Sequence, residues 1–349
     1  MIDTYGYALH EAKGRLSPFR FQRRSPGEHD ILLEVMYCGI CHSDILAAHD
    51  TTGRSLFPMV PGHEIVGRVV GTGDKVTRFR EGDVAGIGCI ADSCRCCAPC
   101  REGYEHYCVE RFVFSFNSRD RSGQPTQGGY SKHYVIDENY ALKMPTGLDP
   151  AAAAPLLCGG ITTYRPLKHY GIGKGKRVGV LGLGGLGHLG IKFARAMGAS
   201  PVILTSSATK IADAAKLGAD EAVLTTDAAQ MKRATGSFDF ILNTISAPHD
   251  PNPYLQLLKR SGMMCLVGIP EKPLAVHPEV LIFGDKELSG SMIGGIALTQ
   301  EMLDFCAEQG IAADVEIIPI QKVNEAWERI ERSDVKYRFV IDMNTLQPE

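Results

Sequence analysis

The stretch RVGVLGLGGLGHLGIKFARAMGA, residues 177–199, decides the fold class of this chain. It begins as an apolar strand, continues through a glycine-rich loop in G-x-G-x-x-G spacing, and then reads as an amphipathic helix that ends at Gly198. Such a loop lets the backbone approach a pyrophosphate at the N-terminus of the helix. We therefore predict that this loop binds a dinucleotide. Its residues are Gly182, Leu183, Gly184, Gly185, Leu186 and Gly187.

The alternation of strands and helices continues after this loop. Strands that alternate with helices of about 10–15 residues are typical of a parallel sheet built from βαβ units. We therefore predict an α/β fold, with a doubly wound parallel sheet in this part of the chain. The further elements are expected as strands at 201–207, 221–226, 238–245 and 263–269, with a helix at 208–220.

The N-terminal part of the chain reads differently. Short β-branched or aromatic runs at 31–40, 63–73 and 130–145 are cut by glycine, proline and aspartate, which predicts a β-rich domain. A helix is expected over 149–167, with an aspartate as its cap and a proline in its first turn. The last expected elements are helices at 300–310 and 323–334 and a strand at 337–343.

Length and composition restrict the class of protein. A chain of 349 residues suggests two domains, at roughly 100–200 residues per domain. The net charge of −3, without a basic or acidic run, gives no indication of a nucleic acid or membrane partner. The N-terminus lacks the apolar region of a signal peptide, and the longest apolar run, 178–191, is too short to span a bilayer. We therefore expect a cytoplasmic protein, in which clustered cysteines bind metal or act in catalysis more often than they form disulfides.

A cluster of cysteines lies in SCRCCAPCREGYEHYC, residues 93–108. Four of its thiols fit C-x2-C-x2-C-x7-C, and such tight spacing lets a turn direct several thiolates at one tetrahedral zinc ion in a closed structural site. Cys89 and Cys96 fall outside this spacing, and their roles stay open. A redox switch is the alternative, although the adjacent Cys96 and Cys97 cannot easily pair with each other. The predicted ligands are Cys94, Cys97, Cys100 and Cys108.

Three other motifs carry a second set of metal-ligating residues. CGICHSD contains Cys41, VPGHEIVG contains His63, and LLCGGITTY contains Cys158. One histidine and two cysteines leave the fourth position of a zinc ion open, which is the catalytic arrangement. Glu64 is a candidate fourth ligand, and Asp44 is a candidate acceptor for the free N–H of His63. Each residue alone has an ordinary structural explanation, so the prediction depends on their occurring together.

The end of the second strand after the glycine-rich loop bears on the choice of cofactor. An NAD-binding chain usually carries a carboxylate about 20 residues after the loop, which binds the ribose 2′-hydroxyl. Here Thr205, Ser206 and Ser207 stand at that place, and Lys210 follows. Hydroxyls and a cation suit a 2′-phosphate, which favours NADP(H), although the two serines also suit helix capping.

Together these motifs resemble the zinc-dependent medium-chain alcohol dehydrogenases and, within them, the cinnamyl alcohol dehydrogenase-like branch. The resemblance covers essentially the whole chain. It implies a GroES-like β-rich catalytic domain over residues 1–157 and a Rossmann NADP-binding domain over 158–295. The segment 296–349 would complete the catalytic domain. Homodimers are common in this branch, so a homodimer is expected. The stretches that carry the resemblance are GICHSD, PGHEIVG, CRCCAPCREGYEHYC, PTQGGYSKHYVID, LLCGGITTY, GLGGLGHLGIKFARAMG and LSGSMIGG.

The resemblance also implies residue roles. It makes Cys41, His63 and Cys158 the catalytic zinc ligands, with Glu64 as an exchanging ligand. It makes the four cysteines of the cluster a structural zinc site, so that two Zn2+ ions are expected per chain. Ser43 corresponds to the hydroxyl that passes the alcohol proton. The further implied cofactor contacts are Thr162 beside the nicotinamide, and Thr244, Gly268, Ser291, Met292 and Ile293. Phe114 falls about where the family has an aromatic pocket residue.

The implied activity is the NADP(H)-dependent interconversion of primary alcohols and aldehydes. Aromatic or allylic substrates are expected, aldehyde reduction is favoured, and zinc polarises the carbonyl oxygen during hydride transfer.

One position departs from the family pattern: Leu46 stands where a histidine usually ends the proton relay. Either His49 or water would have to replace that histidine. The departure motivates an alternative function, a zinc-containing NADPH reductase of C=N or conjugated C=C substrates. A catalytically inactive scaffold is disfavoured, because it need not retain Cys41, His63 and Cys158.

Overall fold

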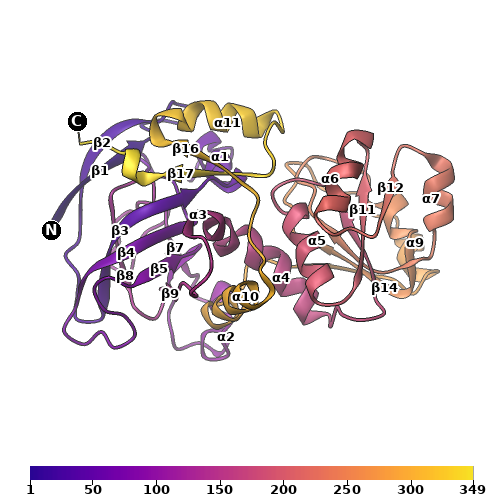
Figure 1. The fold of residues 1–349 in the computed structure, drawn as a ribbon, viewed down its shortest axis with the longest axis horizontal. Helices are drawn as coiled ribbons and strands as arrows, with labels where there is room; N and C mark the ends of the chain where they lie inside the picture. Colours follow the sequence, from indigo (N-terminus) through magenta and orange to yellow (C-terminus); the bar gives the residue numbers. More distant parts are fainter. Residues whose placement is uncertain (349) are drawn as a thin grey trace. The chain divides into compact units, whose positions relative to one another are not determined.

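The computed structural model describes residues 1–348 and divides into two compact units (Figure 1). Unit 1 comprises Met1–Ile161 and Gly294–Glu349, and unit 2 comprises Thr162–Ile293. The first boundary follows Ile161 rather than residue 157, so Cys158 belongs to unit 1. The reason is that the helical turns before Cys158 pack on the sheet strands of unit 1. The second boundary precedes Gly294, two residues before the expected start at 296.

Unit 1 is built on a seven-stranded sheet with the order β16-β17-β3-β4-β5-β9, in which β8 also pairs with β3. Strand β17 lies antiparallel to β3, so the end of the chain completes the sheet that the N-terminal part begins. The strands are β3 (Asp30–Gly39), β4 (Ile65–Thr72), β5 (Val84–Ile87), β8 (His133–Asp137), β9 (Leu142–Lys143), β16 (Val315–Pro319) and β17 (Arg338–Asp342). Two small sheets pair β1 (Ile2–Ala8) with β2 (Ser17–Arg23), and β6 (Ile90–Asp92) with β7 (Val113–Phe114).

The single helix expected over 149–167 is wrong, because the chain leaves helical geometry at Cys158. Helix α3 (Pro150–Ala153) leads into a short 3-10 turn, and helix α4 (Gly159–His169) starts after Cys158. A proline within the turn removes a backbone donor, which disfavours a continuous helix. The expected cap is confirmed, since the Asp149 carboxylate accepts a hydrogen bond from the Ala151 N–H at 3.3 Å. The other helices of unit 1 are α1 (His42–His49), α2 (Ala98–Arg101), α10 (Ile296–Gln309) and α11 (Val323–Glu331).

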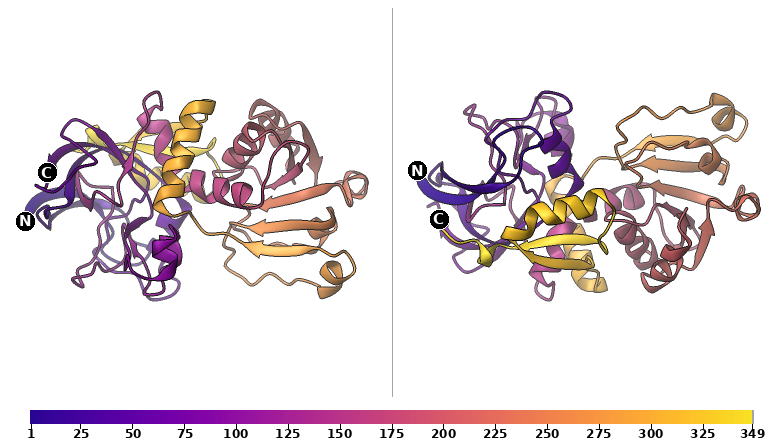
Figure 2. Two further views of the ribbon diagram at one scale, coloured as in Figure 1. Left: turned by 90° about the horizontal axis from the view of Figure 1, so that it is seen from below. Right: turned by 90° about the horizontal axis from the view of Figure 1, so that it is seen from above.

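Unit 2 is a six-stranded parallel sheet with the order β12-β11-β10-β13-β14-β15. This order is that of a doubly wound dinucleotide-binding domain, so the predicted fold class is confirmed. Figure 2 shows the strands of this sheet beside their connecting helices. The strands are β10 (Arg177–Leu181), β11 (Ser200–Thr205), β12 (Glu221–Leu224), β13 (Phe238–Asn243), β14 (Leu258–Leu266) and β15 (Glu287–Gly290). The helices are α5 (Gly187–Ala196), α6 (Ile211–Lys216), α7 (Ala228–Ala234), α8 (Asn252–Leu255) and α9 (Pro278–Ile282).

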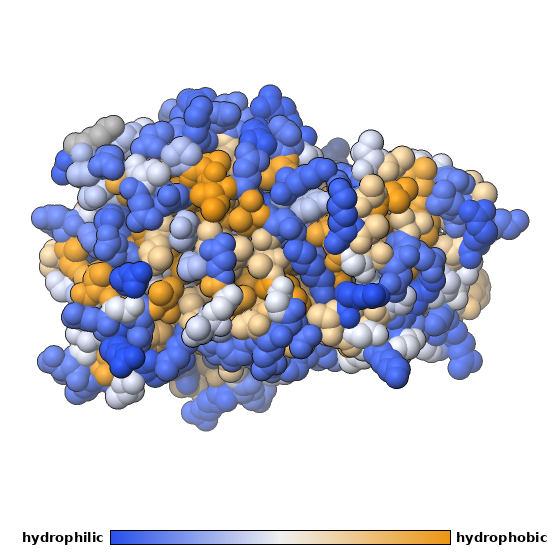
Figure 3. Space-filling view, viewed as in Figure 1, coloured by the Kyte–Doolittle hydropathy of each residue, from blue (hydrophilic) through white to orange (hydrophobic). Residues whose placement is uncertain are grey.

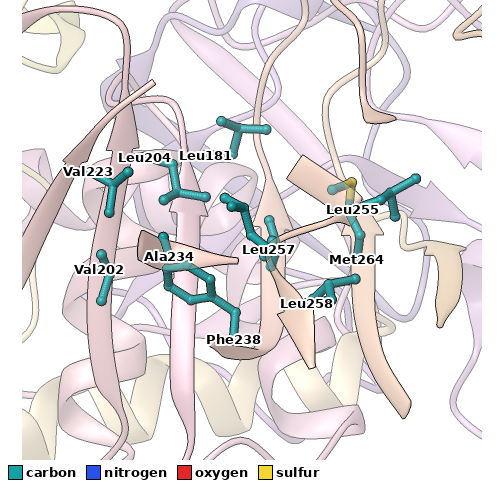
Figure 4. Close-up of a cluster of buried hydrophobic side chains, with 11 residues drawn as sticks. Leu181, Val202, Leu204, Val223, Ala234, Phe238, Leu255, Leu257, Leu258 and Met264 are labelled. Atoms are coloured by element: carbon teal, nitrogen blue, oxygen red, sulfur yellow. The ribbon is translucent and has the colours of Figure 1, made fainter. Parts of the chain in front are cut away.

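A cluster of apolar side chains forms part of the core of unit 2. Val202 and Leu204 of β11 gather with Phe238 of β13, and all three are fully buried (Figure 4). Burial of one such side chain stabilises the folded state by about 1.5–3 kcal/mol relative to leaving it exposed. The apolar strands predicted in this region are therefore held in place by packing against one another and against their neighbouring helices.

The surface is mixed in character. Figure 3 shows hydrophilic residues over much of the visible face, with separate hydrophobic patches between them. Among residues 1–348, no helix combines the length and the apolar character needed to cross a bilayer.

Candidate active site

His63 is directed by a turn that only glycine accommodates. Gly62 has a φ of +106°, and a side chain on it would lie 2.7 Å from the Cys38 Sγ atom. The turn places the His63 Nδ1 atom 3.0 Å from a carboxylate oxygen of Asp44. A proton on Nδ1 then leaves Nε2 as the metal-binding atom. The ring of Phe116 stacks on the imidazole at 5.4 Å between centroids.

Asp44 also shapes the segment that carries Cys41. Cys41 is the N-cap of α1, and its backbone N–H donates to the Asp44 carboxylate at 2.9 Å. A second N–H, from Gly62, donates to the same carboxylate at 3.1 Å. Asp44 is fully buried. The Asp44 carboxylate therefore caps the helix and also holds the His63 imidazole.

Four predicted ligands come together in unit 1. The side chains of Cys41, His63, Glu64 and Cys158 place their ligand atoms within 4.8 Å of one another. The thiols of Cys41 and Cys158 lie 3.9 Å apart. Contact with Cys158 lowers the pKa of Cys41 well below its usual value, and the same contact raises the pKa of Cys158 well above it. Two buried thiols this close do not ionise together readily without a cation between them.

Glu64 has a buried partner that the sequence analysis missed. The Arg338 guanidinium, on β17, forms an ion pair with the Glu64 carboxylate, and neither side chain is more than 8% exposed. Burial raises the pKa of Glu64 to about 7, although Arg338 opposes that shift. A charged residue in the apolar run YRFVIDM was the available signal, because a buried cation requires a partner.

The donors present fit a zinc ion. Two thiols, one imidazole and one carboxylate are the ligand types that zinc binds, and three protein ligands with an exchangeable fourth are typical of catalytic sites. The second carboxylate oxygen of Glu64 is buried and has no hydrogen-bond partner within the described chain. The ion pair with Arg338 holds Glu64 through one carboxylate oxygen, and the other oxygen stays available as a ligand beside Cys41, His63 and Cys158.

The cysteine cluster also closes around one point. The ligand atoms of its four predicted members lie within 4.8 Å of one another. Backbone N–H groups of Cys94 and Cys97 each lie 3.4 Å from a cluster thiol, the first from Cys108 and the second from Cys94. No cysteine of the described chain is in a disulfide. The cluster therefore fits a closed four-thiolate zinc site. Cys89 is buried with its thiol against that of Cys158, and Cys96 is exposed.

The predicted cofactor residues lie at one edge of the sheet in unit 2. Gly182 follows β10, Thr244 follows β13, Gly268 follows β14 and Ser291 follows β15. In open parallel sheets, ligands bind at the carboxyl ends of the strands. Thr244 Oγ1 donates to the Leu181 carbonyl oxygen at 2.8 Å, which joins β13 to β10 at the point where the strand order reverses.

Within the glycine-rich loop, two glycines have distinct roles. A Cβ atom on Gly187 would lie 2.0 Å from the Gly182 carbonyl oxygen, so a side chain is excluded there. A Cβ atom on Gly184 would have no neighbour within 4 Å, so this glycine borders open space. Gly185 and Leu186 complete the turn into α5. The loop thus leaves room beside its backbone for a phosphate group.

The hydroxyl-rich end of β11 is partly engaged within the protein. Ser206 is exposed, whereas Thr205 is buried and accepts a hydrogen bond from the Ser207 N–H at 3.2 Å. Lys210 Nζ donates to the Leu183 carbonyl oxygen at 2.9 Å. The lysine is therefore close to the glycine-rich loop, and Ser206 is the hydroxyl of this segment most open to a ligand.

The remaining predicted residues are placed individually. Thr162, Ser291 and Ile293 are buried, Met292 is exposed, and the Ser291 hydroxyl accepts from Arg165 at 2.8 Å. Ser43 and Phe114 are exposed in unit 1.

His49 lies at the last position of α1, beyond Leu46. Its Nε2 atom is 3.2 Å from a carboxylate oxygen of Glu331 on α11. The His49 imidazole therefore contacts Glu331 and is not grouped with the four ligands.

Comparisons with known proteins agree with this geometry. Residues 27–146 match the alcohol dehydrogenase GroES-like domain, and residues 185–308 match the zinc-binding dehydrogenase model. An aldehyde reductase of Escherichia coli (strain K12) is 51% identical over 342 residues, covering 97% of each chain. The structure of a cinnamyl alcohol dehydrogenase from Sorghum bicolor has a TM-score of 0.97 at 42% identity, covering 100% of this chain and 99% of that one. A cinnamyl alcohol dehydrogenase of Helicobacter pylori, solved in complex with NADP(H), has a TM-score of 0.93 at 36% identity and covers 99% of both chains.

The buried ion pair leads to a stability prediction. Arg338→Met should lower the free energy of unfolding by about 3–5 kcal/mol, because it leaves the Glu64 carboxylate buried without its cation. Urea denaturation of the purified protein measures this. Arg15→Met is the matched control: its Arg15–Glu328 pair is exposed and should contribute at most about 1 kcal/mol. Equal losses in the two variants would contradict the prediction.

Proposed function

The chain belongs to the zinc-dependent medium-chain alcohol dehydrogenases, in the cinnamyl alcohol dehydrogenase-like branch, and from that premise we propose its reaction. The chain is an alcohol and aldehyde oxidoreductase. Its proposed reaction is NADP(H)-dependent interconversion of primary alcohols and aldehydes, with aldehyde reduction favoured and aromatic or allylic substrates. The observation that carries this proposal is the buried group of Cys41, His63, Glu64 and Cys158.

Two zinc ions per chain are proposed, one held by this group and one by the cysteine cluster. When bound, the catalytic zinc supplies a Lewis acid that stabilises negative charge on the substrate oxygen, and the nicotinamide supplies or accepts the hydride. The chain positions these groups in advance. Asp44 fixes the His63 tautomer, Phe116 packs against the imidazole, and Arg338 holds Glu64. Positioning of this kind avoids reorganisation during the reaction.

Ser43 is the proposed proton carrier. It lies in the first turn of α1, two residues after Cys41, and it is exposed. During aldehyde reduction its hydroxyl would pass a proton to the product oxygen, and during alcohol oxidation it would accept one. Leu46, one turn further along α1, carries no titratable group, and His49 contacts Glu331. Water is therefore the proposed source of the proton that Ser43 delivers.

The proposed preference for NADP(H) is supported by the end of β11. No carboxylate stands at Thr205, Ser206 or Ser207, and an acidic side chain there would repel a 2′-phosphate. The exposed Ser206 hydroxyl is available as a donor to that phosphate. The Helicobacter pylori relative is described with NADP(H), which agrees with this choice.

A second candidate function follows from Leu46. An NADPH reductase that acts on C=N or conjugated C=C bonds would have less need of an inward proton path to an alcohol oxygen. The same zinc group and the same cofactor site would serve it. The substrate therefore separates the two proposals.

A homodimer in the cytoplasm is the proposed assembly. Within the described residues, β15 pairs on one side with β14 and is an outer strand of its sheet. Such an edge readily pairs with another chain. Phe283, shortly before β15, is 85% exposed, and an exposed phenylalanine favours burial at an interface.

Unpaired thiols in two metal sites persist best in a reducing compartment, which agrees with a cytoplasmic location.

The reaction is tested by NADPH consumption with zinc-loaded protein and a panel of cinnamaldehyde and small aldehydes. We expect zinc-dependent turnover in the wild type. Cys158→Ala should abolish it and reduce bound zinc from about two ions to one per chain, since a ligand is lost. Cys306→Ala, at a buried cysteine of α10, is the control that should keep both the turnover and the two bound zinc ions.

Absence of aldehyde turnover in the wild type, with zinc and cofactor both bound, would favour the C=N or C=C alternative. Leu46→His would then be tested for gain of aldehyde reduction.

Cofactor choice is tested at Ser206. Ser206→Asp should lower the ratio of kcat/KM for NADPH to that for NADH at least about tenfold, which corresponds to about 1.4 kcal/mol. The physical reason is that the new carboxylate repels the 2′-phosphate of NADPH and accepts a hydrogen bond from the ribose 2′-hydroxyl of NADH. Ser206→Ala separates the loss of the hydroxyl from the added charge and should shift the ratio less. An unchanged ratio in Ser206→Asp would mean that another segment reads the phosphate.

The dimer is tested by sedimentation at micromolar concentration. Phe283→Asp should shift the chain toward monomer, because a charge at the interface is costly to bury. Val109→Asp, at an exposed residue of unit 1, is the control and should leave the dimer intact. A wild-type monomer would reject the proposed assembly.

A further inference from the structure

Cys96 is the one exposed cysteine in the described chain. It lies within the cysteine cluster without being one of its four predicted ligands. Its thiol forms a separate group with the Cys94 thiol and the Glu110 carboxylate, whose ligand atoms all lie within 4.8 Å of one another. Cys94 is therefore shared between two groups. One is the closed four-thiol cluster, and the other faces solvent.

The segment between these two thiols is held firmly. Arg95 has a φ of +62°, a left-handed conformation that a non-glycine residue rarely adopts without support. Its guanidinium donates to Asp92 at 2.9 and 3.0 Å and to Asp137 at 2.8 Å. It also lies 4.9 Å from the centroid of the Tyr140 ring. These contacts fix the turn that brings Cys94 and Cys96 together.

We propose that Cys94 and Cys96 form a redox modification site, at which peroxide converts the two thiols to a disulfide and releases the structural zinc. The inference rests on the structural zinc of the proposed function. As a zinc ligand, Cys94 is a thiolate, which is the form that peroxide oxidises. Cys96 is the resolving thiol: it is near Cys94, exposed, and free of the metal.

The chemistry balances with hydrogen peroxide as the oxidant. The Cys94 thiolate sulfur attacks peroxide and becomes a sulfenic acid, the O–O bond breaks, and the hydroxide released takes a proton from solvent. The Cys96 sulfur then attacks the Cys94 sulfur, an S–S bond forms, the S–O bond breaks, and the Cys96 thiol proton leaves with the hydroxyl as water. The sulfur pair loses two electrons and peroxide gains them. A bond of about 2.05 Å then replaces the present thiol contact, through side-chain rotation.

Release of zinc would reach beyond the cluster itself. Glu105 lies in the cluster segment, and its carboxylate accepts from the Ile296 backbone N–H at 3.2 Å, at the start of α10. The Ser93 hydroxyl lies 3.2 Å from the Cys100 sulfur and 2.7 Å from the Tyr140 hydroxyl. Opening of the cluster therefore weakens contacts with α10 and with the region that follows β8. Formation of the disulfide would therefore lower the stability of unit 1.

The experiment treats the zinc-loaded full-length protein with hydrogen peroxide. Zinc release is followed with a chromogenic chelator, and disulfides are mapped by mass spectrometry of non-reduced tryptic peptides. Trypsin cleaves after Arg95, so a link between Cys94 and Cys96 leaves two peptides joined only by the disulfide. The variant is Cys96→Ser, and Glu110→Gln is the matched control that keeps both thiols. Both variants should keep wild-type turnover before treatment.

We expect the wild type and Glu110→Gln to release one zinc per chain and to form the Cys94–Cys96 disulfide. Both proteins should regain the lost zinc when dithiothreitol and zinc are added. Cys96→Ser should release zinc at least about tenfold more slowly, and its Cys94 should proceed to sulfinic acid, which thiols do not reverse. Release from Cys96→Ser at the wild-type rate, or a link between other cysteines, would overturn the inference alone. One zinc per chain before treatment in the wild type, with none in Cys158→Ala, would overturn both the structural-zinc assignment and this inference.

Discussion

The buried carboxylate of Asp44 joins three segments that are far apart in the chain. It accepts hydrogen bonds from the N–H groups of Cys41 and Gly62 and contacts the imidazole of His63. The first contact fixes the start of α1, and the second fixes the turn before β4. The third fixes the orientation of the His63 ring. A fully buried carboxylate is tolerated only when its oxygens are satisfied in this way. The candidate active site depends on that arrangement, because each contact orients one ligand or the segment that carries it.

The end of the chain supplies the second support of the site. Strand β17 pairs with β3, and this pairing places Arg338 beside Glu64. Because the pair is buried, Arg338 offsets a charge that would otherwise be costly next to two thiols. The C-terminal segment therefore contributes to the electrostatics of the ligand group as well as to the sheet.

The two units illustrate different ways of building a site. In unit 2 the candidate cofactor residues follow successive parallel strands, so the sheet itself places them at one edge. In unit 1 the candidate ligands come from a helix cap, a loop and a break between helices. Such a site needs side-chain contacts to hold it, and Asp44 and Arg338 provide them. The cysteine cluster is the intermediate case, since one short segment supplies every thiol.

The sequence by itself determined the features that depend on local spacing. These are the glycine-rich loop, the parallel strands around it, the four cysteines of the cluster and the ligand candidates at Cys41, His63 and Cys158. Only the tertiary structure decided the break at Cys158, the pairing of Arg338 with Glu64 and the contact of His49 with Glu331. The physical reason is range: a turn or a strand period is set by neighbouring residues, whereas the direction of a buried side chain is set by packing and by charges that lie far away in sequence.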